Sequence, residues 1–262
     1  MRKNNINFPL PNNSQEPAIF YIPHPDDEAI GMAGSIRKQR QEGHPVYLVL
    51  LTNGRNEKTF QLLNGQKYCN IHNTYHHFHI TMEQLMWLRK VEFIASARQL
   101  GVDKLFIINN GQGIEDLNVL QGAYKNVFIR TVQHTILKFH KMFPLAIHHF
   151  TSGPDDIFSH RNSPTETKVN AAHFACWKAA VSLSKYTFKK IFHRIYIYTW
   201  PLEKRISAVK VELDPKSVEI KDAALRQYQF FLPEADRFAI GYHSVPCLIE
   251  AALCDHHEYI DE

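Results

Sequence analysis

Four polar side chains crowd together where a short apolar run ends. The segment IFYIPHPDDEAIGMAG, residues 19–34, places His24, Asp26, Asp27 and Glu28 within five positions. An imidazole and a carboxylate three residues apart can point to one place where a strand turns into a helix, and together they suit a zinc-like divalent ion. Asp26 lies between them and can instead face a water bound to that ion and take its proton. Because acids at a helix start also complement the helix dipole, simple capping is the competing interpretation.

The elements around this motif are expected to alternate between strand and helix. Apolar runs rich in β-branched and aromatic residues predict strands at 18–22, 45–52, 104–109, 145–150 and 193–199. Helical periodicity predicts helices over 28–43, 81–101, 118–143 and 163–186. This alternation predicts an α/β fold with a mainly parallel sheet and helices on both faces. Ligands bind beyond the carboxyl ends of such strands, and the acidic motif follows the first of them.

Capping residues and turn residues predict where two of the helices begin and end. Thr81 is the expected N-cap of the helix that stops at Gly101. Ser163 is the expected N-cap of the last long helix, with Pro164 at its first position. The stretch 54–80 has no clear period and is expected to be a long irregular connection, a class of loop that is often functional.

The chain is expected to divide into three parts. Residues 1–17, rich in Asn and Pro, predict a flexible N-terminal arm, and residues 18–200 predict the catalytic domain. Residues 201–262 predict a C-terminal extension packed on the same domain, with a strand over 206–214 followed by two short helical stretches.

Composition argues against several classes of partner. The net charge is only +4 and the basic residues are scattered, which disfavours nucleic-acid binding. No apolar run approaches the roughly 20 residues that a membrane helix needs, and no secretory h-region is visible, so we expect a cytoplasmic protein without a membrane partner. The four cysteines form no C-x-x-C pair, which fits free thiols in a reducing compartment. Homo-oligomerisation is left open.

Several segments resemble one family of enzymes. PHPDDEAIGMAGSI, from residue 23, resembles the (A/P)-H-P-D-D-E signature of the PIG-L/LmbE-like metal-dependent de-N-acetylases. LVLLTNG, LRKVEFIASARQLGV and FIINNGQG resemble the second strand, the R-x-x-E helix and the substrate loop of that family. The resemblance implies a Rossmann-like fold, a catalytic divalent metal that is usually zinc, and hydrolysis of the acetamide of an N-acetylated amino sugar or glycoconjugate.

The resemblance also implies roles for particular residues. His24 and Asp27 become metal ligands, Asp26 becomes the general base, and Asn110 stands where the family often has an acidic substrate-binding residue. Past about residue 200 the chain matches nothing in the family.

The third metal ligand is where this chain departs from the family pattern. The resemblance implies the last His of an H-x-x-H segment, but here His160 is followed by Ser163 in the fourth position. We expect His160 itself to bind the metal, because only an imidazole restores a His-His-Asp set. Two alternatives stay open: His148 or His149 supplies the ligand, or the site is weakened and the protein is a non-catalytic binding protein.

A metal-bound His160 could not protonate the leaving amine. That proton would come from Asp26, or from His243 in GYHSVP if the C-terminal region folds over the site. Arg55 and His243 join Asn110 as candidate substrate-binding residues.

Other histidines and aromatic residues lie in the irregular stretch and after it. In NTYHHFHI, His77 and His79 alternate and could chelate a metal, although a polar surface loop is the favoured interpretation. Tyr75, Phe78 and Trp87 could form a wall on which a sugar stacks.

Two rival enzyme or binding classes fit less well. A His-His-carboxylate set also serves non-haem iron oxygenases, but the repeated helix signals disfavour their usual all-β barrels. A nucleotide-binding Rossmann protein is disfavoured because the first turn lacks the G-x-G-x-x-G glycines.

Overall fold

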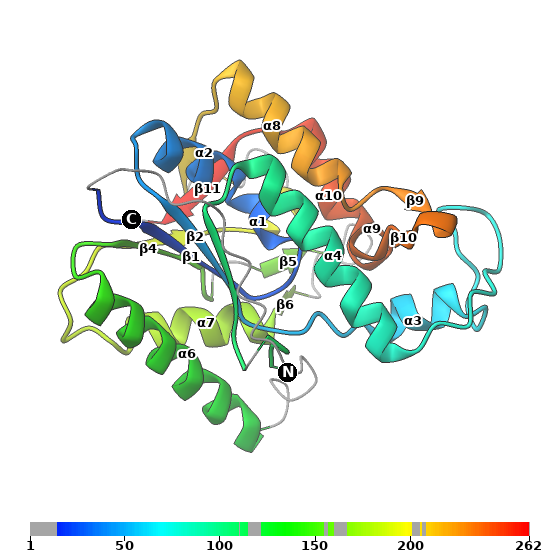
Figure 1. Ribbon diagram of the computed structural model, residues 1–262, viewed down its shortest axis with the longest axis horizontal. Coiled ribbons are helices and arrows are strands. Elements are labelled where there is room, and N and C mark those ends of the chain that lie inside the picture. Colours follow the sequence, from blue (N-terminus) through cyan, green and yellow to red (C-terminus); the bar gives the residue numbers. More distant parts are fainter. Residues whose placement is uncertain are drawn as a thin grey trace.

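A seven-stranded sheet in the order β3-β2-β1-β4-β7-β11-β8 forms the centre of the molecule (Figure 1). The computed structural model describes residues 15–109, 111–114, 122–154, 157–159, 167–200, 205 and 208–261. The strands of the sheet are β1 (Ala18–Ile22), β2 (Val46–Leu50), β3 (Lys104–Ile107), β4 (Ile147–Thr151), β7 (Lys190–His193), β8 (Val209–Val211) and β11 (Glu258–Asp261). The five strands from β3 to β7 run parallel, whereas β11 pairs antiparallel with both of its neighbours. This mostly parallel sheet with its helices confirms the predicted α/β fold.

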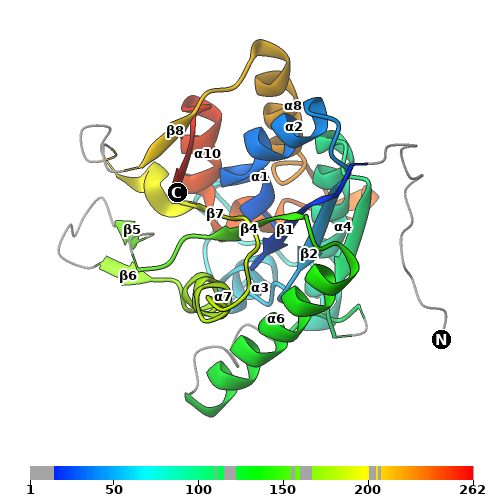
Figure 2. The same cartoon turned by 90° about the vertical axis from the view of Figure 1, so that its left-hand side faces the viewer.

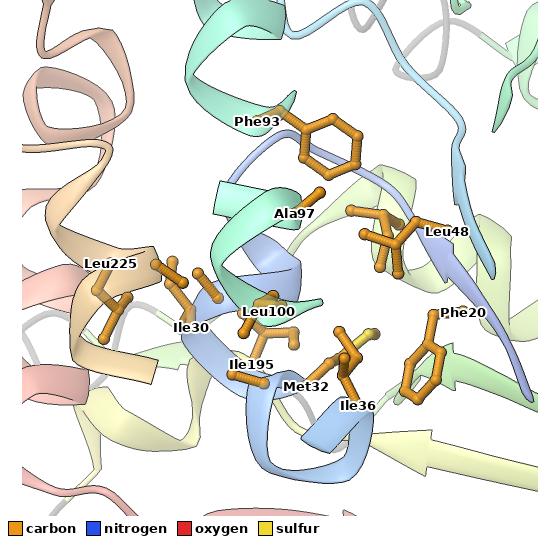
Figure 3. Close-up of a cluster of buried hydrophobic side chains, with 14 of the residues drawn as sticks. Phe20, Ile30, Met32, Ile36, Leu48, Phe93, Ala97, Leu100, Ile195 and Leu225 are labelled. Carbon is orange, nitrogen blue, oxygen red and sulfur yellow. The ribbon is translucent and has the colours of Figure 1, made fainter. Parts of the chain in front are cut away.

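Helices cover both faces of the sheet, and each face has its own apolar core (Figure 2). Phe20 and Ile22 point to the face that carries α1 (Asp27–Gly31), α2 (Ala33–Gln41), α4 (Met82–Leu100), α8 (Pro215–Arg226) and α10 (Pro246–Cys254). Figure 3 shows this core, with Phe20, Leu48 and Phe93 among its side chains. Ile19 and Tyr21 point to the face that carries α6 (Gly122–Met142) and α7 (Ala171–Val181). Burial of every β1 residue explains why its sequence is continuously apolar.

Smaller elements complete the described part of the chain. Two short sheets pair β5 (Ile157–Ser159) with β6 (Thr167–Val169), and β9 (Phe231–Leu232) with β10 (Arg237–Phe238). The remaining helices are α3 (Glu57–Leu63), α9 (Ile240–Ser244) and the 3-10 turns η1 (Tyr196–Thr199) and η3 (Pro233–Ala235). No helix in the described ranges is both long and apolar enough to cross a membrane.

The helix α4 begins and ends as its sequence predicts. The Thr81 hydroxyl accepts from the Gln84 amide while the Gln84 side chain accepts from the Thr81 amide, which makes a capping box. Gly101 closes the helix in the left-handed conformation, with φ 75°. Well-defined ends fix the register of α4, on which Arg89 and Glu92 both face the interior.

Two sequence expectations were wrong in their boundaries. The helix expected from residue 163 begins at Ala171, because residues 167–169 pair with β5 as a strand and Asn170 is the N-cap. Ser163 and Pro164 lie outside the described residues. The strand expected over 193–199 ends at His193, where pairing with β4 and β11 stops, and the chain then forms η1.

Two further expectations needed correction. The helix expected over 28–43 is broken at Met32 into α1 and α2. The stretch 54–80, expected to be irregular, contains α3, which Asn56 caps by accepting from the Thr59 amide.

The C-terminal region joins the central sheet through β8 and β11. Glu258 of β11 accepts hydrogen bonds from the backbone amides of Gly34 and Ser35 at the start of α2. Lys221 of α8 forms a fully buried ion pair with the same carboxylate, at 3.4 Å. Removing one partner of such a buried pair would leave an uncompensated charge, so these contacts fix β11 and α8 against the first half of the chain. The proposed domain boundary at residue 200 stays a prediction, and most of the expected arm lies outside the described residues.

Candidate active site

The acidic motif lies at the carboxyl end of β1, next to the end of β2. The Thr52 hydroxyl donates to the Pro23 carbonyl at 2.7 Å, which ties the two strand ends together. Asp26 follows with φ 132°, a backbone conformation that costs a non-glycine residue about 1–3 kcal/mol. Its amide donates to the Glu28 carboxyl group at 3.1 Å. The surrounding fold therefore holds Asp26 and Asp27 in a strained turn rather than in a relaxed helix cap.

Three side-chain atoms converge at this turn. The Asp27 Oδ2 atom lies 3.3 Å from His24 Nδ1 and 3.1 Å from His173 Nε2. The two imidazole nitrogens are 3.2 Å apart. His173 is fully buried, Asp27 is nearly so, and His24 is the most exposed of the three. His24, Asp27 and His173 thus form one compact donor set, which we call the first cluster.

His173 reaches this cluster because α7 begins immediately before it. The Asn170 side chain accepts from the amides of Ala172 and His173, so His173 occupies the first turn of the helix. Asn170 also donates to the Tyr196 hydroxyl at 2.8 Å, and the Tyr196 ring stacks on His173 with centroids 4.9 Å apart. Asn170 therefore fixes the backbone of His173 and the position of Tyr196, whose ring packs on the imidazole.

The first cluster fits a tetrahedral divalent metal. Ligand atoms about 2.1 Å from a tetrahedral zinc lie roughly 3.4 Å from one another, close to the separations found here. Two imidazoles and a carboxylate are also the donor types of catalytic zinc sites, which use three protein ligands and keep one position for water or substrate.

Asp26 is held beside the cluster by an arginine. Arg89 of α4 donates to Asp26 Oδ2 at 2.7 Å and to the Gly54 carbonyl at 2.8 Å. Gly54 has φ 71°, and a Cβ there would lie 2.9 Å from Arg89 and 3.0 Å from Pro25. The absence of a side chain at Gly54 thus lets α4, the end of β2 and the acidic motif pack against each other.

The pKa values of the two adjacent aspartates are shifted in opposite directions. Burial raises the pKa of Asp26 to about 6, and the charge of Asp27 adds to that rise while Arg89 opposes it. Burial alone would also raise the pKa of Asp27, but His173 and His24 hold it well below its usual range. Asp27 is therefore suited to remain an anionic ligand, and Asp26 to exchange a proton near neutral pH.

Glu28 holds the strained turn in place through buried hydrogen bonds. Its Oε1 atom accepts from the hydroxyls of Ser96 and Tyr228, each at 2.6 Å. Burial raises the pKa of Glu28 to about 8, although these hydroxyls oppose the rise. Because Glu28 also accepts from the Asp26 amide, it links the turn to α4 and to the end of α8.

Only some of the sequence-predicted site residues are brought together. The side chains of His24 and Asp27 lie 3.3 Å apart, and the adjacent Asp26 bonds to Arg89 instead. His160 and Asn110 lie outside the described residues. Arg55 lies beyond β2, 3.5 Å from Glu57. His243 lies in α9.

The two alternative ligands, His148 and His149, lie within the sheet. His148 Nδ1 is 3.1 Å from the Tyr21 hydroxyl, and His149 Nδ1 is 3.0 Å from His193 Nε2. Both histidines are buried on β4, on opposite faces of the strand.

Sequence reasoning missed His173 and the role of Arg89. His173 was counted within a longer helix, and the signal that could have found it is Asn170, a strong N-cap three residues earlier. The R-x-x-E pattern of Arg89 and Glu92 was visible, but the sequence does not say that the arginine reaches Asp26.

A cleft opens at the same edge of the sheet, between α4 and α6. It has a volume of about 630 Å³, and its lining includes Asn53, Trp87, Lys90 and Asn109. Trp87 is 56% exposed, so its ring is available to a ligand. Asn53 adjoins Gly54, which places one end of the cleft near the acidic motif. Of the aromatic residues expected to stack on a sugar, Trp87 lines this cleft, whereas Tyr75 packs against Tyr68 and Phe78 packs against His76.

A family profile described as PIG-L, GlcNAc-PI de-N-acetylase, matches residues 19–181, which is more than half of the chain. The chain belongs to the PIG-L family. The match includes both the acidic motif and His173, so the first cluster lies entirely within the family region. A comparison with curated protein sequences found no match.

Solved structures similar to this PIG-L family member are distant in sequence. A triple-mutant deacetylase of the teicoplanin biosynthetic pathway is 14% identical, with a TM-score of 0.55 over 90% of this chain and 88% of that one. The N,N'-diacetylchitobiose deacetylase from Pyrococcus horikoshii is 16% identical, with a TM-score of 0.52 over 98% and 86%. The A40926 pseudoaglycone deacetylase Dbv21 is 13% identical, with a TM-score of 0.53 over 88% and 85%. At these identities the likeness establishes the shared fold.

Proposed function

We propose that this protein is a metal-dependent de-N-acetylase that removes the acetyl group from an N-acetylated amino sugar or glycoconjugate. The observation that carries the proposal is the convergence of His24, Asp27 and His173 beside Asp26. Membership of the PIG-L family supports the reaction class, and the similar structures named above, which are deacetylases, agree with it.

His24, Asp27 and His173 would hold the metal, for which zinc is the expected ion. A divalent ion there supplies a Lewis acid that polarises the amide carbonyl and acidifies water. Asp26 takes the proton from the attacking water and then delivers it to the nitrogen that leaves as the amine. Arg89 fixes the orientation of the Asp26 carboxylate, and Glu28 fixes its backbone. The products are acetate and the free amine.

The cleft beside the motif supports a sugar as the group that carries the acetamide. The exposed ring of Trp87 offers a stacking face for a pyranose, and the amides of Asn53 and Asn109 can bond hydroxyl groups. Arg55 and Asn110 remain candidate substrate contacts.

His173 completes a set of three metal donors, which argues against a weakened, non-catalytic site. That alternative arose because Ser163 replaces the expected histidine, and His173 supplies an imidazole instead. The donor set of two His and one Asp also matches non-haem iron oxygenases, so oxygen consumption distinguishes the two reaction classes.

The decisive experiment measures amine release from a panel of N-acetylated amino sugars, using protein loaded with zinc. We expect turnover with at least one sugar, no oxygen consumption with an added 2-oxo acid, and loss of turnover in Asp26→Asn with the metal retained. Near-normal turnover in Asp26→Asn would contradict the assignment of the base.

A matched pair of variants identifies the third ligand. We expect His173→Ala to lose the metal of the first cluster together with activity, and His160→Ala to keep both. The reverse result would restore the assignment made from the sequence.

A further inference from the structure

A second group of metal-binding side chains lies outside the proposed active site. Cys69, His72, His76 and His243 each offer a ligand atom, and these atoms all lie within 4.8 Å of one another. We call these four residues the second cluster. Three come from the stretch between α3 and α4, and the fourth comes from α9, more than 160 residues later.

The spacing of the first three residues makes a compact chelating loop. Cys69 and Thr74 pair as a small antiparallel bridge, with the Cys69 amide donating to the Thr74 carbonyl at 2.9 Å. Asn73 turns the chain with φ 51°. This C-x2-H-x3-H loop therefore brings its sulfur and two imidazoles to one side.

Two separations within the second cluster match a tetrahedral metal. The Cys69 Sγ atom lies 3.7 Å from His72 Nδ1, and the same nitrogen lies 3.2 Å from His76 Nε2. A zinc with Zn–S of about 2.3 Å and Zn–N of about 2.1 Å requires roughly 3.6 Å and 3.4 Å for these two pairs. The imidazole nitrogens and the sulfur therefore already stand at ligand–ligand distances.

His243 provides the independent observation. Its Nδ1 lies 2.8 Å from the Ala239 carbonyl, which can only accept, so Nδ1 carries the proton. The Nε2 atom is then left with a lone pair, and it is buried without a hydrogen-bond partner among the described residues. An imidazole whose second nitrogen is fixed by a carbonyl is the usual arrangement of a zinc ligand.

Two phenylalanine rings pack against the second cluster. The Phe231 ring lies 4.0 Å from the His72 ring and 5.2 Å from the His76 ring, centroid to centroid, and Phe78 packs on His76. Cys69 is 1% exposed and His243 is also 1% exposed. His76 is also buried, whereas His72 is partly exposed. A set of four protein donors is typical of structural zinc sites rather than catalytic ones.

We propose that Cys69, His72, His76 and His243 bind a structural zinc ion that fastens the 64–80 segment to α9. This would give His243 a role other than proton donor to the substrate. The site is also mechanically connected to the active site, because the amides of Ile240 and Gly241 donate to Glu92, one turn along α4 from Arg89.

Cobalt spectroscopy tests the proposal without relying on turnover. The full chain is stripped with a chelator and titrated with Co²⁺, whose bond to a thiolate gives an intense near-ultraviolet charge-transfer band. The first cluster contains no sulfur, so of the two clusters only the second can give this band. We expect two equivalents of Co²⁺ to bind, the band to develop with one of them, and added Zn²⁺ to abolish it.

Matched variants make the result specific. We expect Cys69→Ser to lose the band, and Cys254→Ser, which changes an exposed cysteine, to keep it. His173→Ala should keep the band while losing deacetylase activity, so failure of this proposal can be told from failure of the proposed function. Two bound Co²⁺ ions without the band in the unmodified protein would overturn the proposal even if Cys69→Ser does not fold. Persistence of the band in folded Cys69→Ser would also overturn it.

Elemental analysis of the chain purified from medium containing zinc, copper and iron tests the identity of the metal. We expect a zinc that is lost in Cys69→Ser and kept in His173→Ala. Copper or iron showing that behaviour would overturn the zinc assignment.

Discussion

The two histidine clusters use similar donors in different surroundings. The first cluster has three donors, at the end of β1 and the start of α7, with the carboxyl group of Asp26 alongside. The second has four donors, including a thiol, and aromatic rings alongside. A hydrolytic centre needs a vacant coordination position and a base, whereas a structural centre needs a complete ligand set. The chemistry open to a metal site therefore depends on the residues around the ligands as much as on the ligands themselves.

The largest expected effect comes from removing the base that distinguishes the first cluster. Asp26→Asn keeps the side-chain shape but cannot accept the proton, so we expect kcat to fall by about 10²- to 10⁴-fold. Metal content, measured by elemental analysis, should stay unchanged at both clusters. Loss of metal from the first cluster would instead make Asp26 a ligand and weaken the contrast between the two clusters.

The next effect concerns the support of that base. Arg89→Met removes both hydrogen bonds that hold Asp26 and Gly54, and we expect kcat/KM to fall about 10- to 100-fold. Arg98→Met, at an exposed position in the last turn of α4, is the control and should change kcat/KM little. Equal effects of the two substitutions would show that general damage to α4, rather than the Asp26 contact, lowers activity.

Metal removal should affect stability unequally at the two clusters. A metal present at about 1,000 times its dissociation constant stabilises the folded state by about 4 kcal/mol, which is several degrees in Tm. In His173→Ala only the second cluster keeps its metal, and we expect chelation to lower the Tm of this variant by this amount. In Cys69→Ser only the first cluster keeps its metal, and we expect chelation to lower the Tm much less. Differential scanning calorimetry with and without chelator measures both. Equal shifts would mean that the second cluster contributes no more to stability than the first.

The smallest expected effect is on the pH dependence of the free energy of unfolding. It involves Glu92, which connects α4 to α9. Burial raises the pKa of Glu92 to about 8, although the amides of Gly241 and Ile240 oppose the rise. Since the pKa is higher in the folded state than in the unfolded chain, the contribution of this group to stability is full below about pH 4.5 and is lost as the pH rises through 8.

We therefore expect Glu92→Gln to flatten the decline in the free energy of unfolding between pH 5 and pH 8, measured by urea denaturation. Glu83→Gln, an exposed position in the first turn of α4, is the control and should leave the decline unchanged. An unchanged slope in Glu92→Gln would mean that the carboxyl group is ionised in the folded protein.

Local sequence patterns determined the parts of this protein that depend on neighbouring residues. Continuous apolar runs specified buried strands such as β1, and the Thr81 and Gly101 caps specified α4, because both signals act over a few residues. The crowding of His24, Asp26 and Asp27 likewise indicated a metal site, since those side chains are brought together by a single turn.

Tertiary structure alone decided how each set is completed. His173 reaches Asp27 across 146 positions of sequence, and His243 reaches the Cys69 loop across more than 160, because the sheet order and the packing of α4 and α9 bring these elements together. The sequence does not distinguish a histidine that packs in a core, as His149 does on Phe20, from one that can bind a metal together with distant residues. Only the positions of distant backbone segments distinguish these cases, because chelation requires several atoms to meet within a few ångströms.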